Sequence, residues 1–126
     1  MQLAMIGLGR MGANIVRRLM EDGHECVVYD VNPDAVASLV AEGATGADSM
    51  EDLASKLTPT RIVWMMVPAS LTGAVAEEVA AVLDEGDILI DGGNSNYRDD
   101  VRRAKAMREK GIEYVDIGTS GGVFGL

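Results

Sequence analysis

The sequence of 126 residues has little cysteine, little positive charge and no long hydrophobic run, and each shortage excludes a class of protein. A single cysteine, Cys26, cannot form an intrachain disulfide, so we expect a reducing, cytoplasmic setting. The 11 lysines and arginines are outnumbered by 20 acidic residues, and the net charge of −9 argues against a nucleic-acid or anionic-membrane partner. No stretch approaches the roughly 18 consecutive apolar residues of a membrane span. The N-terminus is broken by Arg10 and is not a signal peptide.

The most informative stretch opens the chain. An apolar run ends at Ile6, three glycines follow with the spacing G-x-G-x-x-G, and a helical pattern comes next. This order is typical of a dinucleotide site, in which Gly7 allows a tight turn, Gly9 lets the backbone approach a pyrophosphate, and Gly12 lets the helix pack closely on the sheet. The N-terminus of that helix offers unpaired N–H groups and the positive end of its dipole to the phosphates.

A carboxylate follows the glycines at a suitable distance. Asp30 ends the second expected strand, 18 residues after Gly12, and a ribose-binding acid is expected at about 20. The extra phosphate of NADP would bring a second negative charge near Asp30, and two such charges 4 Å apart repel by about 4 kcal/mol at an effective dielectric of 20. Because Val31 offers no compensating positive charge, the sequence predicts NAD, with NADP bound more weakly. The alternative is that Asp30 is a plain turn residue.

Strands and helices alternate along the whole chain, whose 48% hydrophobic and 25% charged residues fit one globular domain. Strands are expected at about 2–6, 25–30, 44–47, 61–67, 87–91 and 112–117, and helices at about 11–21, 33–42, 50–57, 69–85 and 97–110. The apolar stripe expected on the fourth helix consists of Leu71, Val75, Val79, Val82 and Leu83. This α/β alternation predicts a doubly wound parallel sheet, the Rossmann fold, with strand order 3-2-1-4-5-6 over residues 1–126.

Two further loops reach the carboxyl edge of the expected sheet, where ligands bind. The first, 91–95, has two glycines and the amide of Asn94; taken alone, it fits a tight turn and helix cap equally well. The second, 118–122, places the Ser120 hydroxyl beside two flexible N–H donors that suit a carboxylate or hydroxyl of a substrate. Its alternative is a flexible exit from the domain.

With these motifs the chain resembles the N-terminal domain of decarboxylating 6-phosphogluconate dehydrogenases, and looks closest to their shorter, NAD-preferring branch. The resemblance rests on the segments 6–12, 66–69, 91–95 and 118–122. The first is shared with many β-hydroxyacid dehydrogenases, whereas the last two together are more specific.

The resemblance implies a set of site residues. Those implied to bind the cofactor are Gly7, Leu8, Gly9, Arg10, Met11, Gly12, Asp30, Val31, Asn32, Val67, Pro68, Ala69 and Asn94. Those implied to bind the substrate are Asn94, Ser120, Gly121 and Gly122. Residues 30–32 stand where NADP-using relatives have Asn-Arg-Thr, which supports NAD.

The resemblance also implies a reaction. Such enzymes oxidise 6-phosphogluconate at C3 with NAD or NADP, release CO₂ and give ribulose 5-phosphate, in the pentose phosphate pathway and in gluconate use. The implied partners are 6-phosphogluconate and further copies of the full-length protein, with no nucleic acid, membrane or metal. In the family the base lysine and the acid glutamate come from a helical domain beyond the equivalent of Leu126.

No catalytic residue is assigned within this chain. Its lysines are Lys56, Lys105 and Lys110, and all are expected away from the ligand edge. His24 is expected to be exposed in a turn, while Asp91 and Asp116 are interpreted as turn-capping acids. The chain is therefore expected to bind NAD without turnover. Two alternatives stay open: the cofactor domain of a 3-hydroxyisobutyrate-type β-hydroxyacid dehydrogenase, or a non-catalytic NAD-sensing domain.

Overall fold

A computed structural model of the chain describes residues 1–93 and 97–117, and its centre is a parallel sheet of six strands in the order β3-β2-β1-β4-β5-β6. The strands are β1 (Gln2–Ile6), β2 (Glu25–Tyr29), β3 (Thr45–Gly46), β4 (Ile62–Met65), β5 (Ile88–Asp91) and β6 (Glu113–Asp116). The predicted fold class and strand order are confirmed.

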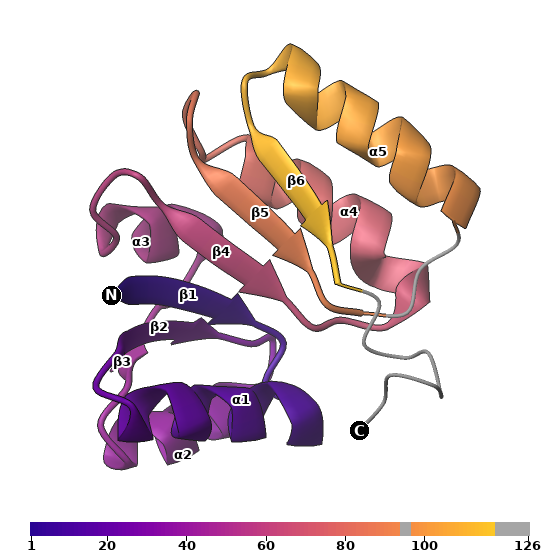
Figure 1. The fold of residues 1–126 in the computed structure, drawn as a ribbon. Helices are drawn as coiled ribbons and strands as arrows, with labels where there is room; N and C mark the ends of the chain where they lie inside the picture. Colours follow the sequence, from indigo (N-terminus) through magenta and orange to yellow (C-terminus); the bar gives the residue numbers. More distant parts are fainter. Residues whose placement is uncertain (94–96, 118–126) are drawn as a thin grey trace.

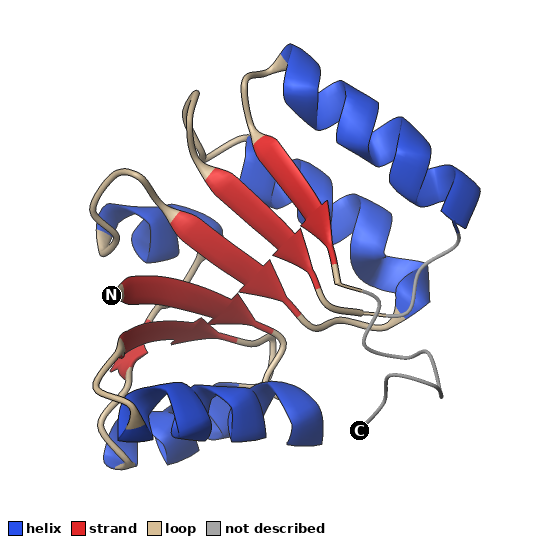
Figure 2. Ribbon diagram, viewed as in Figure 1, coloured by secondary structure: helices blue, strands red, loops and turns tan. Residues whose placement is uncertain are grey.

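Helices cover the sheet on both faces, so the domain has three layers (Figures 1 and 2). The helices are α1 (Arg10–Glu21), α2 (Pro33–Ala41), α3 (Met50–Ser55), α4 (Ala69–Ala80) and α5 (Tyr97–Glu109). Side chains of α1 and α2 pack on one face of the sheet, and those of α3, α4 and α5 pack on the other. All strand arrows end on the same side of the sheet, where the loops that begin α1 and α4 lie (Figure 1).

Local capping residues decide where two helices begin. The Asn32 side chain accepts a hydrogen bond from the Asp34 backbone N–H at 3.0 Å, and Pro33 occupies the first helical position of α2. Ser49 caps α3 in the same way, because its hydroxyl accepts from the Asp52 N–H at 3.0 Å. Both starts are confirmed.

The buried face of α4 differs from the predicted one. Leu71 is 50% exposed, whereas Thr72 and Ala76 are fully buried against the core. Thr72 fits there because its hydroxyl donates to the Pro68 carbonyl at 3.3 Å, which satisfies the polar group inside its own helix. The predicted stripe is therefore wrong at its start by about one position, and Leu71 is free to serve another surface.

His24 also departs from expectation, because it is partly buried rather than exposed in the turn before β2. None of the helices in residues 1–93 and 97–117 has the length and apolar character needed to cross a membrane.

A buried carboxylate joins the start of β4 to the start of β5. Asp87, 2% exposed, accepts hydrogen bonds from the backbone N–H groups of Arg61 and Asp84, each at 2.8 Å. The Arg61 guanidinium lies 3.3 Å from the same carboxylate. Burial opposes the charge on Asp87, but the backbone and guanidinium hydrogen bonds outweigh it and lower the pKa of this carboxyl group.

This pKa shift predicts acid sensitivity. A carboxyl group with a lowered pKa in the folded state stabilises the protein above its unfolded-state pKa, about 3.9, and this contribution is lost as the pH falls through the folded-state pKa. Asp87→Asn is expected to lower the free energy of unfolding by about 2 kcal/mol at pH 7. On acidification, this free energy is expected to fall less in the variant than in wild type. Urea unfolding at several pH values measures both effects, with Asp84→Asn, an exposed partner of Arg61, as control. If the free energy of unfolding depended on pH equally in Asp87→Asn and wild type, the lowered pKa of Asp87 would be contradicted.

Candidate functional site

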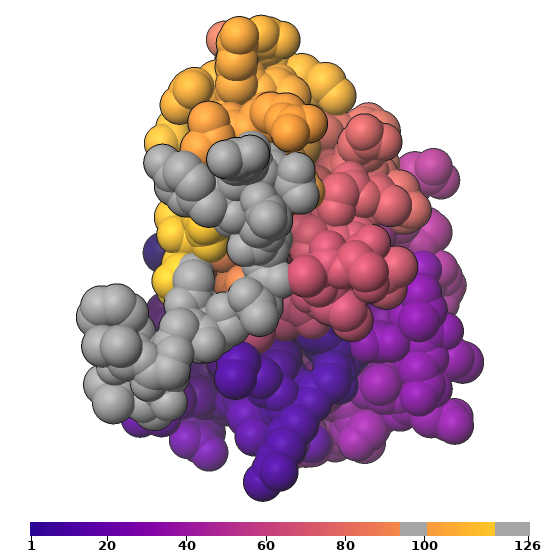
Figure 3. Space-filling model, turned by 90° about the vertical axis from the view of Figure 1, so that its right-hand side faces the viewer, coloured from indigo at the N-terminus to yellow at the C-terminus, as the bar shows by residue number. Residues whose placement is uncertain are grey.

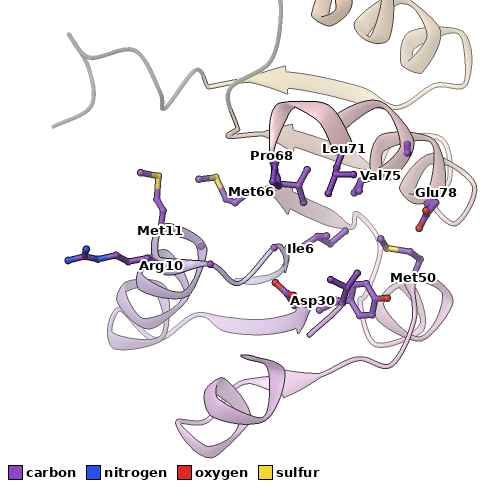
Figure 4. A pocket seen from close by; sticks show the side chains of 17 residues that line it. Ile6, Arg10, Met11, Asp30, Met50, Met66, Pro68, Leu71, Val75 and Glu78 are labelled. Carbon is purple, nitrogen blue, oxygen red and sulfur yellow. The ribbon is translucent and has the colours of Figure 1, made fainter. Parts of the chain in front are cut away.

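A cleft of about 720 Å³ opens at the carboxyl ends of the central strands, between the loop that begins α1 and the helix α4 (Figure 4). On the corresponding side of the molecule, the indigo surface of the N-terminal segment meets the pink surface of α4 (Figure 3). The size is that of a small-molecule or cofactor site. The cleft is lined by Ile6, Gly7, Gly9, Arg10, Met11, Gly12, Tyr29, Asp30, Val31, Met50, Met66, Val67, Pro68, Leu71, Ala74, Val75 and Glu78.

Two glycines of the loop between β1 and α1 are required by its geometry. Gly7 has a φ of +93°, a conformation that L side chains rarely adopt, and a Cβ there would collide with the Met66 carbonyl. A Cβ on Gly12 would collide with the Gly7 carbonyl oxygen, because the first turn of α1 packs directly on the loop. These contacts are those expected of the first and third glycines of the motif.

Gly9 has a different environment. A Cβ on this residue would meet no atom within 4 Å, and its φ of −64° suits any amino acid. Since Gly9 lines the cleft, the missing side chain leaves room for a ligand rather than for protein atoms.

The start of α1 has features of an anion site. Among the described residues, no side chain caps the first turn of α1, and no acidic residue lies in that turn. Arg10 is the first residue of the helix and lines the cleft. The backbone N–H groups and the helix dipole thus favour a negatively charged group at this position.

Asp30 is hydrogen-bonded to the loop between β1 and α1, residues 7–12, which we call the glycine loop. One carboxylate oxygen accepts the Leu8 N–H at 2.6 Å, and the other accepts the Asn32 N–H at 2.8 Å. A carboxylate has about four lone-pair positions, so two remain for further donors such as ribose hydroxyls. Asp30 can therefore position the glycine loop and contact a ligand at the same time, which combines the turn role with the ribose role.

The structure brings most of the residues implied for the cofactor into one place. Nine of them line the cleft: Gly7, Gly9, Arg10, Met11, Gly12, Asp30, Val31, Val67 and Pro68. Leu8 is buried and contributes its N–H to Asp30, Asn32 caps α2, and Ala69 begins α4 outside the lining. Asn94, Ser120, Gly121 and Gly122 lie outside the described residues, so their roles remain predictions.

Some lining residues have no counterpart in the sequence prediction. They are Tyr29, Met50, Leu71, Ala74, Val75 and Glu78. The four from α4 follow the spacing i, i+3, i+4, i+7 and thus share one helix face. That spacing was available in the sequence, but it indicates a covered face without saying what covers it.

Packing explains the two glycines after β5. A Cβ on Gly92 would collide with the Trp64 indole, and one on Gly93 would come within 2.8 Å of the Val67 carbonyl oxygen. Asp91, fully buried, accepts the Gly93 N–H at 2.9 Å and the Tyr114 hydroxyl at 2.8 Å. Burial raises the pKa of Tyr114 more than nearby Arg103 lowers it, so the hydroxyl keeps its proton and donates to Asp91. These contacts fit the interpretation of Asp91 as a turn-capping acid.

A parallel sheet in this order, with a glycine turn after β1 and an acid after β2, defines the chain as a dinucleotide-binding domain of the dehydrogenase type. Comparison with protein families narrows this class, since the family model described as the NAD binding domain of 6-phosphogluconate dehydrogenase matches residues 2–126. The chain belongs to this family.

Similarity to individual proteins agrees with this assignment. The chain is 44% identical over 126 residues to the NAD(+)-dependent, decarboxylating 6-phosphogluconate dehydrogenase of Haloferax volcanii, covering 99% of this chain and 41% of that protein. The structure of 6-phosphogluconate dehydrogenase from Plasmodium falciparum matches with a TM-score of 0.83 and 26% identity, over 90% of this chain and 26% of that one. The 3-hydroxyisobutyrate dehydrogenase of Mycobacterium tuberculosis has a TM-score of 0.82 at 22% identity, over 91% of this chain and 39% of that one, and shares the fold.

Proposed function

We propose that this chain is the cofactor-binding part of an enzyme that oxidatively decarboxylates 6-phosphogluconate to ribulose 5-phosphate and CO₂ with reduction of NAD. The proposal rests on the family membership and on the similarity to the Haloferax volcanii enzyme, whose name specifies NAD. The observation that carries the choice of NAD is the position of the Asp30 carboxylate. It lies in the cleft between the end with Arg10 and the end with Glu78 (Figure 4).

The residues present fit a dinucleotide. The space in front of Gly9 and the uncapped start of α1 suit a pyrophosphate, and the free lone pairs of Asp30 suit the hydroxyls of a ribose. A bound NAD would supply the acceptor for the hydride removed from the substrate. The chain's own residues bind and orient this cofactor.

The acid and base belong to other parts of the enzyme in this proposal. Within the described residues, the cleft contains no histidine, the side chain that most often acts as general acid or base, and no lysine, the residue that acts as base in the family. We therefore expect this chain to bind NAD and to show no turnover of 6-phosphogluconate by itself.

Calorimetric titration of the chain with NAD and with NADP, at one fixed salt concentration, tests the cofactor assignment. We expect NAD to bind at least about tenfold more tightly, because the 2′-phosphate of NADP would face Asp30. Equal affinities would contradict the assignment.

An NMR titration of the NAD-loaded chain with 6-phosphogluconate and then with 3-hydroxyisobutyrate tests the substrate class, since only the former is expected to shift the Asn94 and Ser120 signals.

A further inference from the structure

The cleft has a second polar feature at the end opposite Arg10. Helix α4 presents one face to the cleft, formed by Leu71, Ala74, Val75 and Glu78. The first three side chains are apolar and the last is a carboxylate. Because a helix rises about 1.5 Å per residue, this face extends for about 10 Å and places Glu78 at its far end.

The position of Glu78 follows the order of the cofactor's parts. In the close view, Arg10 and Met11 lie at one end of the cleft, Met50 and Glu78 lie at the other, and Asp30 lies between them (Figure 4). With a pyrophosphate at the glycine loop and a ribose at Asp30, the base attached to that ribose occupies the end near Glu78.

The walls of this end suit a flat aromatic ring. Leu71 and Val75 from α4 lie on one side of the cleft, and Met50 lies on the other (Figure 4). Tyr29 and Val31, the chain neighbours of Asp30, also line the cleft. Apolar side chains on both sides cover the faces of a base but do not distinguish one base from another. Discrimination requires a polar group directed at the base edge.

Two side chains of this end carry a polar group, Glu78 and Tyr29. The Tyr29 hydroxyl can donate or accept a hydrogen bond and so suits an amine or a carbonyl, whereas the Glu78 carboxylate only accepts and can therefore discriminate between them. A carboxylate accepts hydrogen bonds from the exocyclic amine of a base and repels a carbonyl oxygen at the same position. We propose that Glu78 accepts a hydrogen bond from the exocyclic amine of adenine and thereby selects adenine dinucleotides over those with a carbonyl at that ring carbon. This inference rests on the proposed function, since it requires NAD in the cleft.

The test compares NAD with nicotinamide hypoxanthine dinucleotide, in which a carbonyl oxygen replaces the amine. Wild-type chain is expected to bind NAD about tenfold more tightly than the hypoxanthine analogue, as for one hydrogen bond to a charged acceptor. Glu78→Gln is expected to reduce this ratio to about twofold, chiefly by weakening NAD, because an amide can offer either a donor or an acceptor. Calorimetry of both ligands with both proteins measures the four affinities.

Glu77 provides a matched control. It is the neighbouring acid on α4, it is exposed, and it lies outside the cleft lining, so Glu77→Gln changes the net charge equally but should keep the tenfold ratio. Equal binding of the two dinucleotides to wild type, or an unchanged ratio in Glu78→Gln, would overturn the role of Glu78 while leaving the proposed function intact. Failure of wild type to bind either dinucleotide would overturn the proposed function and this inference with it.

Discussion

Replacing Gly9 with alanine is expected to weaken NAD binding at least about tenfold while changing the free energy of unfolding by less than about 0.5 kcal/mol. The added methyl group meets no protein atom within 4 Å, and the backbone at Gly9 already has a φ of −64°, so the fold accommodates it. The same methyl group would occupy the space in front of the loop where the pyrophosphate is proposed to lie. Calorimetry with NAD and urea unfolding separate the two quantities.

Gly12→Ala is the matched control for this prediction. Its methyl group would collide with the Gly7 carbonyl oxygen, which belongs to the backbone and has little freedom to move. The variant is expected to lose about 3 kcal/mol of stability, as overpacked sites do, in addition to losing affinity. If Gly9→Ala bound NAD as tightly as wild type, the glycine loop would not be the phosphate site.

Asp30→Ala is expected to remove most of the discrimination between NAD and NADP. Loss of the hydrogen bonds to the ribose weakens NAD by about 2 kcal/mol, roughly thirtyfold. NADP loses less, because the repulsion between its phosphate and the carboxylate is removed together with the hydrogen bonds. The preference for NAD should fall from at least about tenfold to within about threefold, measured by titration with both cofactors.

The Leu8 N–H loses its acceptor in the same variant, which adds a cost in stability of about 1–3 kcal/mol. Binding is therefore compared at a temperature where urea unfolding shows the variant to be folded. Asp34→Asn removes one negative charge from the exposed start of α2, outside the cleft lining, and is expected to keep the preference. A preference retained in Asp30→Ala would assign Asp30 to the glycine turn alone.

Much of the architecture could be predicted because local signals and global order agree in this chain. The caps Asn32 and Ser49, and the apolar runs of the strands, specify elements whose order permits few topologies. The motif around Gly7 and Gly12 was equally readable, because Gly7 is required by the positive φ of its own turn and Gly12 by its contact with the nearby Gly7 carbonyl.

The second wall of the cleft could not be predicted in the same way. The sequence places Leu71 and Val75 on an apolar stripe, and periodicity alone assigns such a stripe to the core. In the fold, the adjacent face with Thr72 and Ala76 packs on the sheet, because Thr72 satisfies its hydroxyl within the helix. The start of the stripe, Leu71 and Val75, lines the cleft instead, while Val79 and Leu83 remain in the core.

The sequence by itself thus determined the parallel sheet, its strand order, the glycine loop and the acid that follows it. Tertiary structure alone decided that Asp30 binds the loop through Leu8, and that α4 brings Glu78 to the far end of the same cleft. The physical reason is that glycine turns and helix caps are set by neighbours in the chain. The orientation of α4, in contrast, is set by packing between segments far apart in the sequence, which no local pattern encodes.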